Sequence, residues 1–594
     1  MMRRVTGPTD HVVIVGAGLS GLSAALHLAG AGRRVTLVER DSVPGGRAGV
    51  LDFDGYRVDT GPTVLTMPEL VDEALSAVGT SLREELDLLP LDPAYRACFA
   101  DGSAVDVHTD PAAMEEEVRR FAGPAEAAGY RRLRSWLTKM YRAEMHRFID
   151  ANFDSPLDLL TPELAKLAAL GGFGRLAPAI GRYLRDERLQ RVFSFQALYA
   201  GLDPRRALAL YSVISYMDTV NGVWFPRGGM HALPSAMARA AQRAGVEFHY
   251  GTEVAALERS GGRVRAVRCA GGERIIGDAF VLTPDLPVVN QLLNRSPRRP
   301  LRWSPSAVIV HAGTSRSCPG TTHHTISFGS AWEKTFTEII HRGRLMSDPS
   351  LLISRPTATD PSLAPDGREL HYVLAPCPNL RTGPIDWESV GPAYRDELFA
   401  LLDARGLTGF GEAVEMHRLI TPAHWGAQGH GAGTPFFAAH LQPDGTVPAA
   451  QPGSRGGEHG LGGLGNHSGR RRAARAHLGQ ARGPAHPRIG PRVEVAHPAQ
   501  AGIPTTSRAG FSNGVSGEPF RLAPRGSGSG FPDGIPTRDR TGAHGRRRAS
   551  KATSEPTTTI TGRRGPKCRV RNCRASNRPH SRTEGARHVK AGPL

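Results

Sequence analysis

A glycine-rich turn near the N-terminus constrains the fold of this chain more than any other feature. The β-branched run HVVIV at residues 11–15 predicts a strand buried on both faces. An apolar helical pattern follows up to Gly32, and the run RRVTLV at residues 33–38 predicts the next strand. A strand, a helix and a strand within about 30 residues, joined by GxGxxG, are typical of a dinucleotide-binding unit. We therefore predict an α/β fold that begins with a Rossmann-type domain.

The positions of this turn have separate predicted roles. Gly16 makes the tight turn, Gly18 lets the backbone approach a pyrophosphate, and Gly21 lets the helix pack on the strand. Glu39, at the end of the second strand, is placed to accept a hydrogen bond from a ribose 2′-OH. The alternative is a glycine-rich turn in a fold that binds nothing. The predicted cofactor site begins with Gly16, Ala17, Gly18, Leu19, Ser20, Gly21 and Glu39.

A second glycine pair and a later turn indicate which dinucleotide is bound. Gly45-Gly46-Arg47 suits another close approach to phosphate, with a guanidinium at hand. DTGPT at residues 59–63 is a turn after a short predicted strand at residues 56–58. The run from GAGLSGL through ERDSVPGGRA to DTGPTVLT resembles the bacterial-type phytoene desaturases, carotenoid desaturases of the FAD-dependent amine-oxidase-like superfamily. The resemblance implies FAD rather than NAD, and adds Arg40, Gly45, Gly46, Arg47, Gly61, Pro62 and Thr63 to the predicted site.

The middle of the chain is predicted to be mostly helical, because apolar residues recur at three- and four-residue spacing. The more apolar stretch at residues 157–183, which carries Lys166, Arg175 and Arg182, suits either a helical cap on its own core or a surface that rests on a membrane. The resemblance implies a hydrophobic polyene substrate, a cytoplasmic location with peripheral association at the inner face of the cell membrane, and oxygen or quinone as electron acceptor. The expected helices are 112–121, 126–148, 162–170 and 184–198.

A tryptophan–phenylalanine pair precedes a third glycine pair. Trp224 and Phe225 can line an apolar channel, or they can form a corner of the core. The run FPRGGM resembles the family's motif where the chain returns to the flavin domain. The resemblance implies that Trp224 and Phe225 contact substrate and that Gly228 and Gly229 contact flavin. It also implies that Val254 meets the adenine through its backbone.

Neither a metal site nor a catalytic acid or base is predicted. The pair His323-His324 suggests a metal or a general base. However, adjacent residues on a strand point to opposite faces, which argues against a shared metal. The six cysteines form no CxxC pair, and no stretch of 18 or more apolar residues occurs, so neither a disulfide framework nor a membrane-spanning helix is expected.

Composition changes abruptly after His440. Residues 1–440 carry 47 basic and 48 acidic side chains, whereas residues 441–594 carry 27 basic and 8 acidic ones. The basic excess therefore describes a tail rather than a body that binds nucleic acid, and no specific nucleic-acid partner is predicted. The resemblance also stops at His440, before the last flavin-binding motif of the family. The tail is predicted to be disordered or to be translated GC-rich noise.

The genetic code offers an explanation for this boundary. Read from the second base of each codon, residues 440–447 permit T-F-S-Q-T-A-P-F, and residues 463–474 permit G-S-G-T-T-P-G-V-G-V-P-P. Both runs match what the family shows there, and both fall in the same alternative frame. We hypothesise a single frameshift near His440, in the gene or in its sequencing. The alternative is a genuine basic tail that binds nucleic acid or membrane.

The predicted architecture is a Rossmann-type FAD-binding domain with a mixed α+β substrate domain and a disordered basic C-terminal tail. The predicted function is an FAD-dependent oxidoreductase that introduces double bonds into phytoene or a related polyene by hydride transfer to flavin, inactive if the last flavin motif is lost. The alternatives are another carotene-modifying or amine-oxidase-type flavoenzyme, and a non-catalytic product with a basic tail. The expected segments are 8–90 and 226–290 for FAD binding, 91–225 for a helical cap, 291–440 for the substrate-domain sheet, and 441–594 for the tail.

Overall fold

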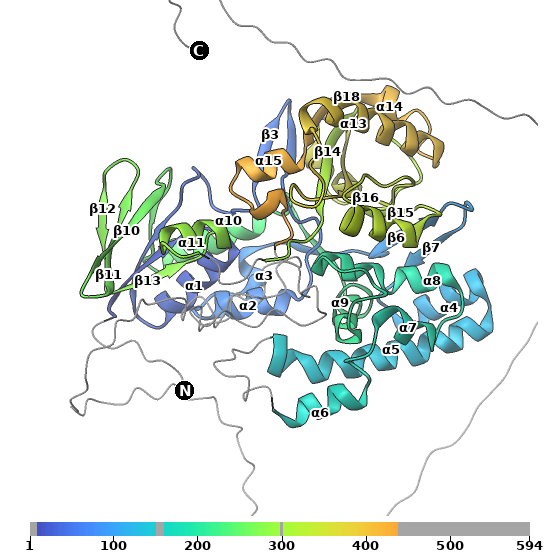
Figure 1. Ribbon diagram of the computed structural model, residues 1–594, viewed down its shortest axis with the longest axis horizontal. Helices are drawn as coiled ribbons and strands as arrows, with labels where there is room; N and C mark the ends of the chain where they lie inside the picture. The colour runs from blue at the N-terminus through green and yellow to red at the C-terminus, as the bar shows by residue number, and fades with distance from the viewer. Residues whose placement is uncertain (1–8, 150–159, 297–300, 438–594) are drawn as a thin grey trace, which may run out of the picture. The chain divides into compact units, whose positions relative to one another are not determined.

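The computed structural model describes residues 9–149, 160–296 and 301–437 of the 594 (Figure 1). All of them fall within one compact unit, residues 1–488. The predicted tail at residues 441–594 lies outside the described residues, as do residues 150–159. Among the helices of the described part, none combines the length and apolarity that crossing a membrane needs.

The predicted βαβ unit is confirmed. Strand β1 (His11–Val15), helix α1 (Leu19–Gly30) and strand β2 (Arg34–Val38) follow one another, and β1 and β2 pair in parallel. Strands β9 (Glu247–His249) and β13 (Ala279–Leu282) complete a parallel sheet in the order β13-β1-β2-β9. Because helices and a second sheet cover both of its faces, its central strands are almost wholly apolar.

The two faces of this sheet have different covers. Helix α10 (Ala232–Arg243) packs against α1 on one side. The other side packs against an antiparallel three-stranded sheet of β10 (Val254–Ser260), β11 (Arg263–Cys269) and β12 (Arg274–Ile276), and against α11 (Leu286–Leu292). The small sheet stands beside β13 and α11 in Figure 1.

A second, larger sheet has seven strands in the order β18-β14-β17-β16-β15-β6-β7. On one face of its strand β14 (Ser306–Thr314), Val308 and Val310 pack against α13 (Trp387–Ala404). Ala307 and Ile309 lie on the opposite face, as their alternation requires. The other strands are β15 (His324–Phe328), β16 (Leu351–Ser354), β17 (Glu369–Cys377), β18 (Val414–Ile420), β6 (Tyr95–Phe99) and β7 (Ala104–Val107). The hairpin β6–β7 therefore belongs to this sheet, although the sequence assigned residues 91–225 to a helical cap.

The helical region lies between β7 and residue 221. Its helices are α4 (Pro111–Ala122), α5 (Pro124–Glu144), α6 (Pro162–Ala169), α7 (Leu176–Gly181), α8 (Glu187–Val192) and α9 (Ser212–Tyr216), gathered together in Figure 1. The prediction of one helix over residues 184–198 was wrong, because α8 ends at Val192. Side chains donate hydrogen bonds to carbonyls that would bond to backbone N–H groups in a longer helix. Gln196 Nε2 donates to the Val192 carbonyl, and Ser215 Oγ donates to the Phe193 carbonyl.

Short elements connect the two sheets. Strand β5 (Leu88–Pro90) pairs with β8 (Trp224–Pro226), which joins the chain before the helical region to the chain after it. The remaining elements are β3 (Val50–Phe53), β4 (Tyr56–Asp59), α2 (Pro68–Ser76), α3 (Leu82–Glu85), α12 (Trp332–Phe336), α14 (Phe410–Ala413) and α15 (Pro422–Ala427).

Candidate functional site

Two of the three glycines in the first turn are required by the fold itself. Gly16 adopts φ +104° while its N–H donates to the Val38 carbonyl at 2.8 Å. A Cβ on Gly21 would lie 1.9 Å from the Gly16 carbonyl oxygen. Any side chain at Gly21 would therefore push α1 away from β1.

Gly18 is different, because nothing in the described chain demands a glycine there. Its φ of −67° suits any residue, and the nearest atoms to a Cβ at Gly18 lie 4.0 Å away, on Gly45 and Gly46. Helix α1 begins at this point without a side-chain cap. A glycine that the fold does not require, at an uncapped helix N-terminus, fits a bound diphosphate. The turn therefore fits the phosphates of a dinucleotide.

The two glycine-rich turns lie against each other. The N–H of Gly45 donates to the Ala17 carbonyl at 2.9 Å, and Gly46 at φ +56° would bring a Cβ to 3.2 Å from Gly18 Cα. The predicted residues Ala17, Gly18, Gly45 and Gly46 are thus neighbours. Together they lie at the N-terminus of α1.

Glu39 faces the first turn from the end of β2. Its buried carboxylate accepts hydrogen bonds from the N–H groups of Ala17 at 2.5 Å and Asp41 at 3.0 Å. The N–H of Thr252 donates to the Glu39 carbonyl at 2.8 Å, and Val254 packs in the same apolar cluster as Val38. The acid and Val254 thus lie at the same end of the parallel sheet.

The two predicted arginines are already engaged by later parts of the chain. Arg47 lies 3.1 Å from the carboxylate of Asp285, donates to His430 Nδ1 at 3.2 Å, and has its guanidinium 3.6 Å from the centre of the Phe437 ring. Arg40, which is half exposed, donates to the Gln428 carbonyl at 3.3 Å. The segment at residues 428–437 therefore lies directly over the second glycine turn.

The turn at residues 59–63 is fastened to the third glycine pair. The Asp59 carboxylate accepts hydrogen bonds from the N–H groups of Met230 at 2.7 Å and His231 at 3.0 Å. A Cβ on Gly229 would lie 2.9 Å from Asp59 Oδ2, and a Cβ on Gly61 would lie 1.8 Å from the Arg47 carbonyl oxygen. Burial raises the pKa of Asp59 to about 6, while the two N–H donors act in the opposite direction. Gly228 and Gly229 thus lie beside the Asp59 turn.

A small cavity of about 20 Å³ lies between these turns and the large sheet. It brings Thr63, predicted for cofactor, next to Phe225, predicted for substrate, whereas Trp224 is not among its lining residues. Across from them lie His311 on β14 and Tyr372 on β17, neither of which was predicted from the sequence. Nothing in the spacing of the two strands marks these residues, and only the register that pairs His311 with Tyr372 brings them together. The full lining is Val58, Asp59, Thr63, Phe225, Met230, His311, Ser354, Pro356, Leu370 and Tyr372.

The prediction that His323 and His324 point apart was wrong. Their ring centres lie 4.5 Å apart, because His323 precedes β15 and escapes the alternation of the strand. Since burial lowers the pKa of His324 to about 4, the ring is neutral, and its Nε2 donates to the Thr63 carbonyl at 3.0 Å. His323 packs its ring 4.5 Å from the ring of Phe225. The pair therefore supports both the predicted cofactor turn and the predicted substrate residue.

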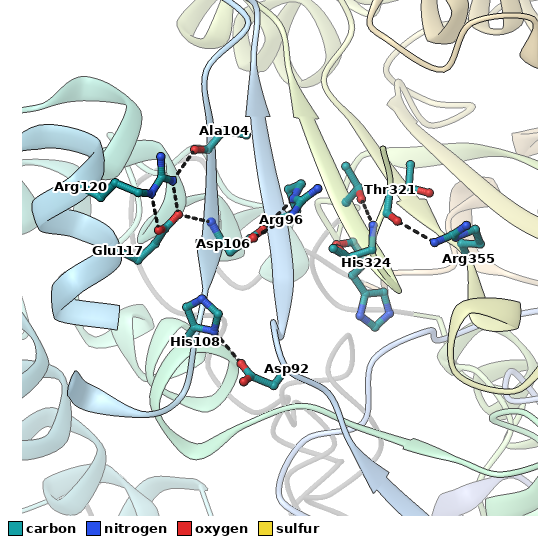
Figure 2. Close-up of polar contacts among 12 residues, drawn as sticks. Asp92, Arg96, Ala104, Asp106, His108, Glu117, Arg120, Thr321, His324 and Arg355 are labelled. Carbon is teal, nitrogen blue, oxygen red and sulfur yellow. Dashed lines mark hydrogen bonds and ion pairs between the residues drawn. The ribbon is translucent and has the colours of Figure 1, made fainter. Parts of the chain in front are cut away.

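Polar networks beyond the cavity hold the edge of the large sheet (Figure 2). Arg96 pairs with Asp106 at 2.7 Å across the β6–β7 hairpin, and Glu117 on α4 accepts the N–H of Asp106 at 2.9 Å. On the same sheet, Arg355 donates to the Thr321 carbonyl at 2.8 Å and pairs with Glu369 at 2.7 Å. These contacts bind strands and helix together, and none of their residues lines the cavity.

Comparison with known proteins agrees with this geometry. The family model of flavin-containing amine oxidoreductases matches residues 19–387. The chain is 65% identical over 446 residues to the phytoene dehydrogenase of Streptomyces griseus, a match that covers 74% of this chain and 88% of the relative. It is 35% identical to the zeta-carotene-forming phytoene desaturase of Myxococcus xanthus, covering 70% and 81%. It is 33% identical to the lycopene-forming phytoene desaturase of Pantoea ananas, covering 69% and 85%.

Proposed function

The chain belongs to the phytoene desaturases of the flavin-containing amine oxidoreductase family, and on this premise we propose that its FAD-dependent reaction introduces double bonds into phytoene or a closely related polyene. The premise rests on 65% identity to a relative of which the match covers 88%. The relatives in this group differ in the product that their names state, so the number of double bonds introduced is left to experiment.

The N-terminus of α1 at Gly18, which no side chain caps, is the observation that carries the cofactor part of the proposal. Gly18, Gly45 and Gly46 would hold the diphosphate, Glu39 the ribose, and the turns at residues 59–63 and 228–229 the flavin ring. When bound, FAD supplies the acceptor for the hydride that leaves the polyene. The residues of this chain bind and orient the reactants and keep water away from them.

The cavity carries the substrate part of the proposal. Phe225, Met230 and Leu370 line it with apolar side chains of the kind that would contact a hydrocarbon, and Thr63 connects it to the cofactor turn. Phe225 is 1% exposed and its ring rests against His323, so its position is fixed by packing. We place the reacting carbons of the polyene beside Phe225.

We further propose that the flavin site of the chain as written is incomplete. The match to the Streptomyces griseus relative leaves about a quarter of this chain and 12% of the relative uncovered, in line with a change of reading frame near His440. Phe437, three residues before that point, lies on Arg47 at the second glycine turn. The sequence that follows in the correct frame therefore starts beside the cofactor and would supply its last contacts.

Peripheral association with the cytoplasmic face of the membrane is also proposed, with oxygen or quinone as the electron acceptor. Two large apolar side chains flank α6: Leu160 is 71% exposed and Phe173 is 49% exposed. Lys166 on the helix is exposed, as are Arg175 and Arg182 nearby. Exposed apolar and basic side chains together suit an anionic bilayer that holds the substrate.

Conversion of phytoene tests the activity. The frame-restored chain, loaded with FAD and supplied with phytoene in liposomes, is expected to give products with longer conjugated systems, detected by their absorption after chromatography. Unchanged phytoene in the presence of FAD and of either acceptor would contradict the proposal.

A further inference from the structure

His311 is a buried polar side chain whose two ring nitrogens find no hydrogen-bond partner anywhere in the described chain. The residue is 1% exposed and lines the cavity together with Thr63 and Phe225. A buried polar group without a hydrogen-bond partner destabilises a fold, so the presence of His311 calls for a role other than folding. An apolar polyene offers the ring no hydrogen bond either.

The sheet fixes the direction of this ring. His311 lies opposite Tyr372 on β17 and Arg418 on β18, and cross-strand partners share a face. The His311 and Tyr372 rings are 5.2 Å apart, on the face away from the α13 core. Asp59 lines the cavity with them. The groups that face His311 are therefore Tyr372, Arg418 and Asp59.

We propose that His311 accepts the proton that is released when the double bond forms; the assignment rests on the proposed desaturase function. When bound, FAD would accept the hydride that leaves one carbon with its electron pair. The C–H bond of the neighbouring carbon breaks, its electron pair becomes the second bond of the new C=C, and the proton passes to an imidazole nitrogen.

The protonation state of the ring agrees with this role. Burial and the charge of Arg418 lower the pKa of His311 to about 3, so the imidazole is neutral at physiological pH and has a free lone pair. A weak base is sufficient, because a carbon next to one that has lost hydride is a strong acid. A weak base also releases its proton readily after turnover.

Stability gives a test that needs no cofactor. If His311 is kept for chemistry, His311→Leu removes an unpaired polar group and raises the Tm of the FAD-free chain by about 1–3 °C. His371→Leu is the matched control, because His371 is as buried but pairs with Glu369, so its loss lowers Tm. A lower Tm for His311→Leu would mean that the ring supports the fold, and would overturn the proposal.

Single-turnover reduction of flavin tests the chemistry. It is measured in whichever full chain retains FAD, the chain as written or the frame-restored one, and that chain is the parent. His311→Gln is expected to keep its FAD and to slow reduction by phytoene about 100-fold or more, and added imidazole is expected to restore the rate in His311→Ala. A His311→Gln rate within threefold of the parent's, or no rescue by imidazole, overturns the assignment. If the parent itself does not reduce its flavin with phytoene, the proposed function fails instead.

Discussion

The Asp59 carboxylate accepts the backbone N–H of Met230 at 2.7 Å, across 171 positions of sequence. This bond joins the turn after β4 to the glycine pair after β8, two segments that the resemblance assigns to flavin. It does so with a partly buried carboxylate, and burial raises the pKa of Asp59 to about 6. Protonation of this one side chain therefore changes the contact that holds the two turns of the candidate site together.

The stability of the FAD-free protein should depend on Asp59 in a defined pH window. Because the folded pKa of about 6 exceeds the ordinary aspartate value of 3.8, the contribution of Asp59 to stability is fully present below pH 3.8 and is lost as the pH rises through 6. Relative to Asp59→Asn, the parent should lose about 2 kcal/mol of unfolding free energy between pH 4 and pH 7. Thermal unfolding of both chains across that range measures the difference, and a difference that stays constant would contradict the assignment.

The first-turn glycines should separate folding from cofactor binding. Gly18→Ala meets no atom closer than 4.0 Å at an ordinary φ, so it should keep or raise the stability by about 0.5 kcal/mol while it weakens FAD binding. Gly21→Ala places Cβ 1.9 Å from a carbonyl oxygen and should destabilise the fold by about 3 kcal/mol. Tm and FAD titration report the two effects.

Gly271→Ala is the control for this pair, because no atom lies within 4 Å of its Cβ and its φ is ordinary. It should keep or raise the stability by about 0.5 kcal/mol, as Gly18→Ala does, and leave FAD affinity unchanged. If Gly18→Ala binds FAD as tightly as Gly271→Ala, the diphosphate does not pass Gly18.

Phe225 should matter for turnover more than for flavin. Phe225→Leu keeps an apolar wall but removes the ring that rests on His323, so the rate of phytoene conversion should fall about tenfold while FAD is retained. Phe328→Leu alters an equally buried ring that does not line the cavity, and should leave the rate per bound flavin unchanged. Equal rates for the two variants would remove Phe225 from the substrate site.

The surface around α6 should account for membrane binding. Replacing both Leu160 and Phe173 with Ser is expected to lower binding to anionic liposomes at least about threefold without lowering Tm, since both side chains are exposed. Ile276→Ser on β12 changes a side chain that is 59% exposed and should leave liposome binding as it was. Sedimentation with liposomes compares the variants, and an equal loss for Ile276→Ser would argue against a specific surface.

The Rossmann unit was predictable because its signals are local. β-branched strands, glycines at a fixed spacing and one acid specify the strands β1 and β2, the helix α1 and the turn between them. The break after Val192 was not predictable, because the groups that end α8 come from Gln196 and from Ser215 on another helix. The hairpin β6–β7 joins the large sheet through parallel pairing with β15, more than 200 residues further along the chain.

Some residues of the candidate site were also predictable from local sequence signals, and others were not. The spacing of the glycines and of Glu39 predicts their roles. His311, in contrast, follows the apolar run Ala307–Val310 in its strand, and no motif marks it. Its importance follows from its register with Tyr372 and from the absence of a hydrogen-bond partner among the described residues. Neither property exists before the strands pair. Arg47 shows the converse, since its ion pair with Asp285 and its stacking on Phe437 depend on segments that sequence spacing does not connect.

The flavin content of two purified chains tests the central claim most directly. One is the sequence as written, and the other restores the alternative frame after His440. We predict that the restored chain carries about one FAD per chain, with its visible absorption spectrum, and that the chain as written carries little or none. Equal flavin content in both would contradict the frameshift account, because the flavin site would then be complete without the sequence that the alternative frame encodes.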